Sequence, residues 1–154
     1  MKQKEHYTQA LPHLRDFCLR HGEPTTFAAG QTIEAEGDAA SLFGYIETGS
    51  FQYTVRDYHG TKQVMETAAA GDFIGHYPYC LDGDAAPTTI VATQSAIVHM
   101  VSGRQLSEHF LQSRDGVELA MHYLRYRFAR LHQLRRQYYL PTDPWTNKQV
   151  PKRF

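Results

Sequence analysis

His76 and Cys80 are the pair of residues whose types and spacing could do chemistry. They stand four positions apart, so one turn of helix would present both side chains on the same face as ligands for a metal or a haem iron. Pro78 lies between them and interrupts such a turn, and a histidine beside a thiol is more often packed than ligating. We therefore predict no metal site and no cofactor.

The other histidines form no catalytic pattern. His59 and His99 are single residues, far in sequence from His76, whereas a metal-binding barrel enzyme of the cupin type uses a close His-x-His pair and a glutamate. A Ser-His-Asp arrangement, a phosphate-binding glycine loop and a CxxC pair are also missing. The sequence predicts a protein that is not an enzyme, with a cupin-like metal enzyme as the alternative.

Length and composition favour one ordinary domain. The 154 residues are enough to bury a core, and the two cysteines, Cys18 and Cys80, are too few for a disulfide framework. We expect both thiols to be free. No apolar run reaches the length of a signal-peptide core or a membrane span, so we expect a cytoplasmic protein without membrane contact.

The charge is balanced only on average. Residues 1–113 contain 7 Lys and Arg against 13 Asp and Glu, and residues 114–154 contain 9 against 3. The basic segment is predicted to lie against its own acidic domain or to be solvated. The alternative is attraction to nucleic acid or to another acidic surface.

Four segments would position these residues. Residues 1–22 include an amphipathic helix from Tyr7 to His21, which ends before Gly22. Residues 23–113 carry frequent glycines between β-branched and aromatic runs, which predicts many short strands. Apolar and polar residues alternate over residues 51–56, and a return strand starts near Lys62, which together predict a half-buried hairpin. Ser102 with Gln105 predicts a capping box that opens a short helix.

Residues 114–140 carry the clearest periodicity. Apolar residues at alternating steps of four and three predict a long helix with a dimer seam made of Val117, Met121, Leu124, Phe128, Leu131 and Tyr138. A second apolar face, formed by Leu119, Ala120, Tyr123 and Leu134, would pack on the helix's own domain. We predict a homodimer. Pro141 and Pro144 end the helix, and residues 141–154 form a tail.

Glycines and apolar residues recur in a definite order through the middle of the chain. In chain order they are Phe27, Gly30, Ile33, Glu36, Gly37, Asp38, Tyr45, Ile46, Gly49, Gly60, Gly71, Asp72, Phe73, Ile74, Gly75, Ile90, Val91, Ala92, Ala96, Ile97 and Val98. This order resembles the cyclic nucleotide-binding β-roll of Crp/Fnr-type regulators. The resemblance covers nearly all of residues 23–138. It implies an α+β fold, an antiparallel β-roll or jelly-roll with an N-terminal helix and a long C-terminal dimerisation helix.

The resemblance also implies a site, which this sequence alters. Family members that hold cAMP or cGMP use a Gly-Glu pair, a helical turn and then an arginine, which together meet the ribose and the phosphate. Here Gly75 matches the glycine, His76 takes the glutamate place, and Ala86 or Pro87 takes the arginine place. No Lys or Arg occurs from Gln63 to Gly103, so the pocket is predicted to be acidic and unsuited to phosphate.

We therefore predict a stand-alone regulatory module for signal transduction whose effector is neither cAMP nor cGMP. The candidate pocket residues are Gly75, His76, Tyr77, Tyr79, Cys80, Ala86, Thr88 and Thr89, which could line a cavity for a neutral, cationic or aromatic ligand or could simply fill the core. One alternative is cAMP or cGMP binding with a cation supplied by Arg56, Lys62 or Arg104, and another is an adaptor without a ligand.

Crp/Fnr-type transcription factors continue past the long helix into a winged helix-turn-helix. Residues 141–154 are too few to form one, so we expect no sequence-specific DNA binding by this chain alone.

Overall fold

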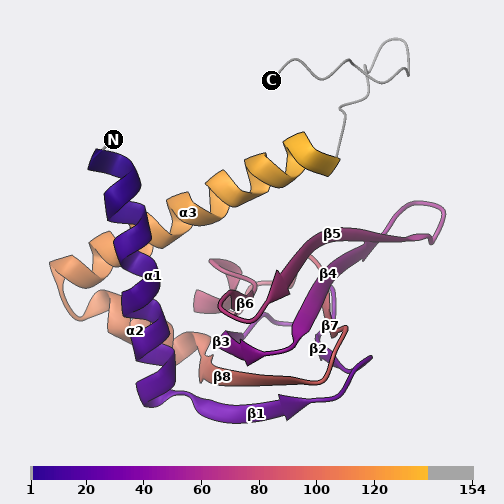
Figure 1. The fold of residues 1–154 in the computed structure, drawn as a ribbon, viewed down its shortest axis with the longest axis horizontal. Helices are drawn as coiled ribbons and strands as arrows, with labels where there is room; N and C mark the ends of the chain where they lie inside the picture. The colour runs from indigo at the N-terminus through magenta and orange to yellow at the C-terminus, as the bar shows by residue number, and fades with distance from the viewer. Residues whose placement is uncertain (1, 139–154) are drawn as a thin grey trace.

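The chain forms a roll of two antiparallel sheets with helices gathered at one end (Figure 1). The computed structural model describes residues 2–138, with side chains for residues 10–134. One sheet has the strand order β1-β8-β3-β6 and the other β2-β7-β4-β5. The strands are β1 (Glu23–Phe27), β2 (Thr32–Glu34), β3 (Leu42–Thr48), β4 (Ser50–Arg56), β5 (Lys62–Ala69), β6 (Phe73–Gly75), β7 (Thr89–Ala92) and β8 (Ala96–Ser102). This arrangement confirms the predicted α+β fold.

The predicted hairpin is formed by β4 and β5, which pair from Ser50 with Ala69 to Arg56 with Lys62. Its turn is held by Asp57, whose Oδ1 accepts hydrogen bonds from the backbone N–H groups of His59 and Thr61, both at 2.9 Å. The alternation of buried and exposed residues fails at Thr54, which is buried. A register shift between Tyr53 and Thr54 explains the failure, because a bulge moves the next side chain to the other face.

A glycine is required where the chain passes from β3 to β4. Gly49 has φ +93°, and a Cβ there would overlap Ala96 at the start of β8. Only glycine combines this backbone conformation with so close an approach. The glycine pattern in the sequence therefore marks corners of the roll.

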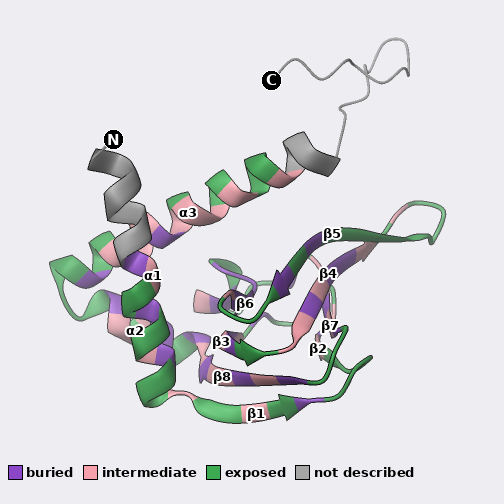
Figure 2. Ribbon diagram, in the orientation of Figure 1, coloured by how far each residue is buried: buried purple, intermediate pink, exposed green. Residues whose placement is uncertain are grey.

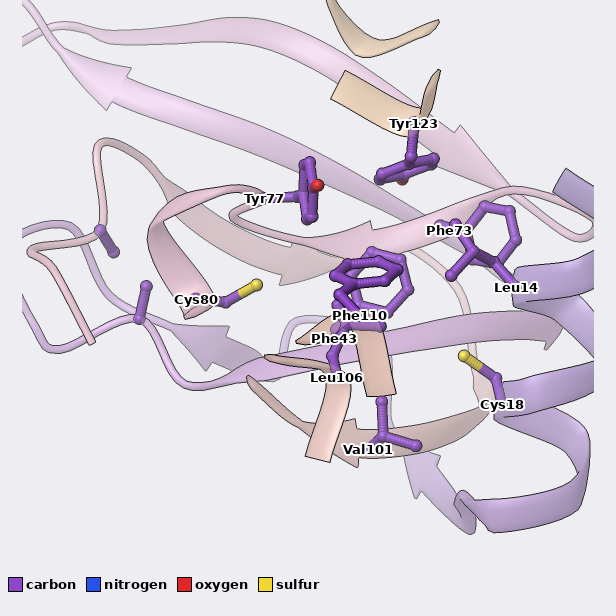
Figure 3. Close-up of a cluster of buried hydrophobic side chains, with 12 residues drawn as sticks. Leu14, Cys18, Phe43, Phe73, Tyr77, Cys80, Val101, Leu106, Phe110 and Tyr123 are labelled. Atoms are coloured by element: carbon purple, nitrogen blue, oxygen red, sulfur yellow. The ribbon is translucent and has the colours of Figure 1, made fainter. Parts of the chain in front are cut away.

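The apolar side chains form two clusters. The first lies between the sheets and includes Phe27, Ile46, Phe51, Ile90 and Val98. The second lies between the roll and the helices, where Tyr77, Phe73 and Tyr123 surround Phe43 and Phe110 and where Leu14 and Cys18 reach in from the N-terminal helix (Figure 3). Tyr77 and Tyr123 of this second cluster meet edge to face, with 4.8 Å between their ring centroids, whereas Phe43 and Phe73 stack with 5.5 Å between theirs. This cluster fixes the helices on the roll.

The helices begin and end where local signals place them, with one difference. α1 (Lys2–His21) starts before the predicted Tyr7, because Lys, Gln and Glu favour helix even where no apolar face marks it. α2 (Gly103–Leu111) opens with the predicted capping box, in which the Ser102 Oγ accepts from the Gln105 N–H at 3.0 Å and the Gln105 Oε1 accepts from the Ser102 N–H at 2.9 Å. A short 3-10 helix, η1 (Tyr79–Leu81), follows β6.

α3 (Arg114–Tyr138) has two unlike faces, which Figure 2 shows as alternating purple or pink and green segments. Tyr123 is buried, and Leu119, Ala120 and Leu124 pack against the core beside it. On the other face, Val117, Met121, Phe128 and Leu131 are exposed to 45, 56, 56 and 46 %. Leu124 is thus partly covered, and the Tyr138 side chain and the tail lie outside the described residues.

No helix in the described part of the chain is both long and apolar enough to span a membrane. Cys18 and Cys80 are free thiols, as expected, and both are buried.

Candidate functional site

A cavity of about 590 Å³ lies between the β4–β5 hairpin, the segment that follows β6, and α3. Most of its wall is apolar or aromatic. Its lining residues are Tyr53, Val55, Met65, Glu66, Gly75, His76, Tyr77, Tyr79, Pro87, Thr88, Arg127, Leu131 and Leu134. The volume is in the range of ordinary small-molecule sites.

Five of the eight predicted pocket residues line this cavity: Gly75, His76, Tyr77, Tyr79 and Thr88. Three do not. Cys80 and Ala86 are each 2 % exposed and belong to the core between roll and helices, and the Thr89 Oγ1 accepts a hydrogen bond from the Glu36 N–H at 2.9 Å. η1 turns Cys80 into that core, Ala86 is buried in it as well, and the Thr89 hydroxyl is turned to Glu36 although its neighbours Pro87 and Thr88 line the cavity.

His76, which takes the place of the family's glutamate, is held by two side chains. Its Nδ1 lies 2.8 Å from the Glu34 Oε1 and its Nε2 lies 2.7 Å from the Thr88 Oγ1. The ring is 4 % exposed. Both ring nitrogens therefore have hydrogen-bond partners inside the protein. Of these two partners, Thr88 lines the cavity and Glu34 does not.

Glu34 is a buried carboxylate that holds its charge. Burial raises its pKa. The hydrogen bonds from His76 and from the backbone N–H groups of Ser41 (2.8 Å) and Leu42 (3.2 Å) together lower the pKa by more than burial raises it, so the net pKa is below the ordinary value. The Glu34 carboxylate therefore accepts a hydrogen bond from the Nδ1–H of His76. Cys80, the second half of the possible ligand pair, is an apolar core residue whose pKa burial raises to about 12.

Tyr53 closes the base of the cavity. Its hydroxyl donates to the Gly75 carbonyl at 3.2 Å and accepts from the Gly75 N–H at 3.1 Å. Its ring meets His76 edge to face at 5.9 Å. Burial raises the pKa of this hydroxyl, so it stays protonated. The Tyr53 hydroxyl thereby satisfies both the N–H and the C=O of Gly75, whose φ is +134°.

An ion pair crosses the cavity wall from α3 to β5. Arg127 donates from Nη1 to the Glu66 Oε1 at 2.7 Å and from Nη2 to the Glu66 Oε2 at 2.8 Å. Arg130 extends the pair, with its Nε 3.3 Å from Glu66 and its Nη1 3.2 Å from Asp72. Burial lowers the pKa of Arg127, but its hydrogen bonds to Glu66 raise it above the ordinary value, so the guanidinium is charged.

These contacts correct the prediction of an acidic pocket without a cation. The cation comes from Arg127 on the basic helix, which lies against its own acidic domain as the charge distribution favoured. The three cations proposed from sequence lie elsewhere: Arg56 donates to the Gly60 carbonyl, Arg104 pairs with Glu108, and Lys62 is exposed. The signal for Arg127 was present, because it continues the inward face of α3 four residues after Tyr123.

The place of the family's arginine is uncharged in three dimensions as well. Ala86 is buried in the core, and Pro87 contributes an apolar surface to the cavity. The two polar anchors that a cyclic nucleotide would need are thus replaced by a histidine held by Glu34 and Thr88 and by an apolar wall.

A model of the cyclic nucleotide-binding domain matches residues 24–113, and the chain belongs to that family. No curated protein matches the sequence.

Solved structures share the fold at low identity. A cyclic nucleotide-binding domain from Methylobacillus flagellatus KT is 17 % identical, with a TM-score of 0.67 over 79 % of this chain and 68 % of that chain. FixK2 from Bradyrhizobium japonicum is 12 % identical, with a TM-score of 0.64 over 73 % and 55 %. The catabolite activator protein of Thermus thermophilus is 18 % identical, with a TM-score of 0.61 over 77 % and 53 %. The matched part spans about half the length of the last two proteins.

Proposed function

We propose that this chain is a dimeric regulatory domain whose cavity receives an uncharged, largely apolar effector rather than cAMP or cGMP. We assign residues 1–22 to a helical segment, residues 23–113 to the sensor, residues 114–140 to dimerisation and residues 141–154 to a tail. The function is regulation and not catalysis.

The bidentate Arg127–Glu66 pair carries the argument against a phosphate ligand. Arg127 is the one cation among the described residues that line the cavity. Its side chain is 14 % exposed and that of Glu66 is 5 % exposed. Moving the guanidinium onto a phosphate would break its bidentate pair with Glu66 and would leave that buried carboxylate beside the anion, with Arg130 as its remaining partner. Breaking a buried ion pair in this way is unfavourable.

The composition of the wall supports an apolar effector. Apart from the neutralised ion pair, the described polar groups at the cavity are hydroxyls and the His76–Thr88 unit, and the rest is aromatic or aliphatic. Such a site gains free energy from apolar surface removed from water, and a few hydroxyls fix the orientation of the ligand.

α3 connects the cavity to the proposed dimer. Leu131 lines the cavity and also belongs to the exposed apolar face that includes Val117, Met121 and Phe128. A second copy of the same face is the partner that buries it symmetrically, as the heptad spacing favours. A ligand that contacts α3 would then bias how two protomers pack.

The effector site is tested by calorimetric titration with cAMP and with cGMP at low salt, and by the fluorescence of the neutral dye Nile red. We expect no heat from either nucleotide and saturable dye binding. Met65→Trp, which fills the cavity, should weaken dye binding, whereas Val64→Trp should not, because Val64 is equally exposed on the same strand but is not a lining residue. Micromolar nucleotide binding, or equal dye binding by both variants, would overturn the proposal.

The dimer is tested by sedimentation velocity of wild type and Phe128→Glu. We expect a dimer that the substitution dissociates, because a carboxylate would be buried in the seam. Leu111→Glu is the matched control, since Leu111 is an apolar residue exposed to 73 % outside α3. A monomeric wild type at micromolar concentration, or a dimeric Phe128→Glu, contradicts the assignment.

A further inference from the structure

Two histidines from helices far apart in sequence meet on the surface away from the cavity. The Nε2 atoms of His13 on α1 and His109 on α2 lie 3.0 Å apart. The Phe17 ring stacks on His109 with 4.2 Å between centroids, which fixes the orientation of that imidazole. Of the two histidines, His109 is therefore held in place by its packing against Phe17.

The separation of the two Nε2 atoms matches that of two ligands on one metal ion. Imidazole nitrogens bind Zn²⁺ at about 2.0–2.1 Å, so two of them on one ion lie about 2.9–3.4 Å apart for ligand angles between octahedral and tetrahedral. The two Nε2 atoms already have this separation. Without an ion they share one hydrogen bond, and one ring must then accept while the other donates.

A hollow of about 420 Å³ lies beside the pair and leaves room for further ligands. Its polar lining residues are both histidines, a third histidine, His122, and Gln112, Ser113, Asp115 and Glu118. In the described part of the chain no three His, Cys, Asp or Glu side chains already form a complete metal cage. The two histidines would thus be the protein ligands, and water or a carboxylate turning in from the start of α3 would complete the coordination.

We propose that His13 and His109 form a binding site for a late first-row divalent ion, Zn²⁺, Ni²⁺ or Cu²⁺, which clamps α1 to α2. Neutral imidazole suits these ions, whereas Mg²⁺ and Ca²⁺ prefer oxygen ligands. Because Cys18 and Cys80 are buried in the core, thiols do not compete for the ion in the folded protein.

The test is calorimetric titration of the tag-free full chain with Zn²⁺ and Ni²⁺, with Mg²⁺ as a negative control, together with thermal unfolding. We expect one site in the micromolar range. Free Zn²⁺ at about 100 times Kd should raise Tm by about 5–10 °C, and EDTA should reverse the rise.

His13→Asn is the informative variant, because His13 is exposed and its replacement leaves the core intact. We expect it to abolish both the binding heat and the rise in Tm, and His109→Asn to do the same. The matched control is His59→Asn, an exposed histidine on the β4–β5 turn, which should bind like wild type. Absence of Zn²⁺ binding by wild type, or binding that survives His13→Asn, overturns the proposal. Either result leaves the effector cavity and the dimer unaffected.

Discussion

Replacing Glu66 by glutamine should destabilise the protein far more than an ordinary ion-pair substitution. The Glu66 carboxylate is 5 % exposed and accepts two hydrogen bonds from Arg127, with Arg130 at 3.3 Å. The variant leaves the Arg127 guanidinium, 14 % exposed, without a counter-charge. Removal of one partner from a buried pair typically costs about 3–5 kcal/mol in the free energy of unfolding.

Arg127→Met should cost less, about 2 kcal/mol, because Glu66 keeps Arg130 as a partner. The double variant Glu66→Leu/Arg127→Met removes both charges, and Arg130 retains Asp72. We therefore expect the double variant to be more stable than Glu66→Gln alone, which is the non-additivity of a coupled pair.

The assay is urea unfolding followed by circular dichroism, with the free energy taken from midpoint and slope. Arg104→Met is the matched control, since the Arg104–Glu108 pair has side chains 88 and 65 % exposed and such pairs contribute at most about 0.5 kcal/mol. A Glu66→Gln variant within about 1 kcal/mol of wild type would refute the claim that this pair is desolvated and structurally required.

Three further predictions concern the roll and its helices. Gly103→Ala should lower Tm by several degrees in a thermal melt, because a Cβ there would overlap the Cys80 carbonyl oxygen, and a wild-type Tm would contradict the close packing of α2 on η1. Tyr53→Phe should cost about 1–3 kcal/mol in urea unfolding, since it leaves the buried N–H and C=O of Gly75 unpaired, and an unchanged midpoint would show that water replaces the hydroxyl. Burial and then the nearby α1 histidines lower the pKa of His109 from 6.5, so the unfolded state binds the proton more readily and the free energy of unfolding should fall as pH drops below 6.5. The fall should be shallower in His109→Asn, and equal slopes would contradict the assignment.

Much of the candidate site was beyond the reach of sequence interpretation, and the misplaced residues show why. Cys80, Ala86 and Thr89 have the residue types of a pocket wall, and their neighbours Tyr79, Pro87 and Thr88 do line the cavity. Neighbours in an irregular segment point in unrelated directions, and neither helical nor strand periodicity assigns their faces. Arg127 belongs to the basic segment that was predicted to lie against the acidic domain or to be solvated, and it was not named as a pocket residue although it follows Tyr123 along the buried face of α3.

What the sequence determined by itself was local. The capping box joins residues three apart, the apolar steps along α3 are three and four, and Gly49 marks a corner whose backbone conformation disfavours a Cβ. These features, together with the order of the glycines, were enough for the roll, its helices and the altered phosphate cassette.

The tertiary structure alone decided which distant side chains meet. Glu66 and Arg127 are 61 residues apart, Glu34 and His76 are 42 apart, and His13 and His109 are 96 apart. No periodic signal connects such pairs, because their distance depends on how sheets and helices pack and not on the rise per residue of one element. For this reason the chemistry of the cavity wall, and that of the histidine pair, could be derived only from the folded chain.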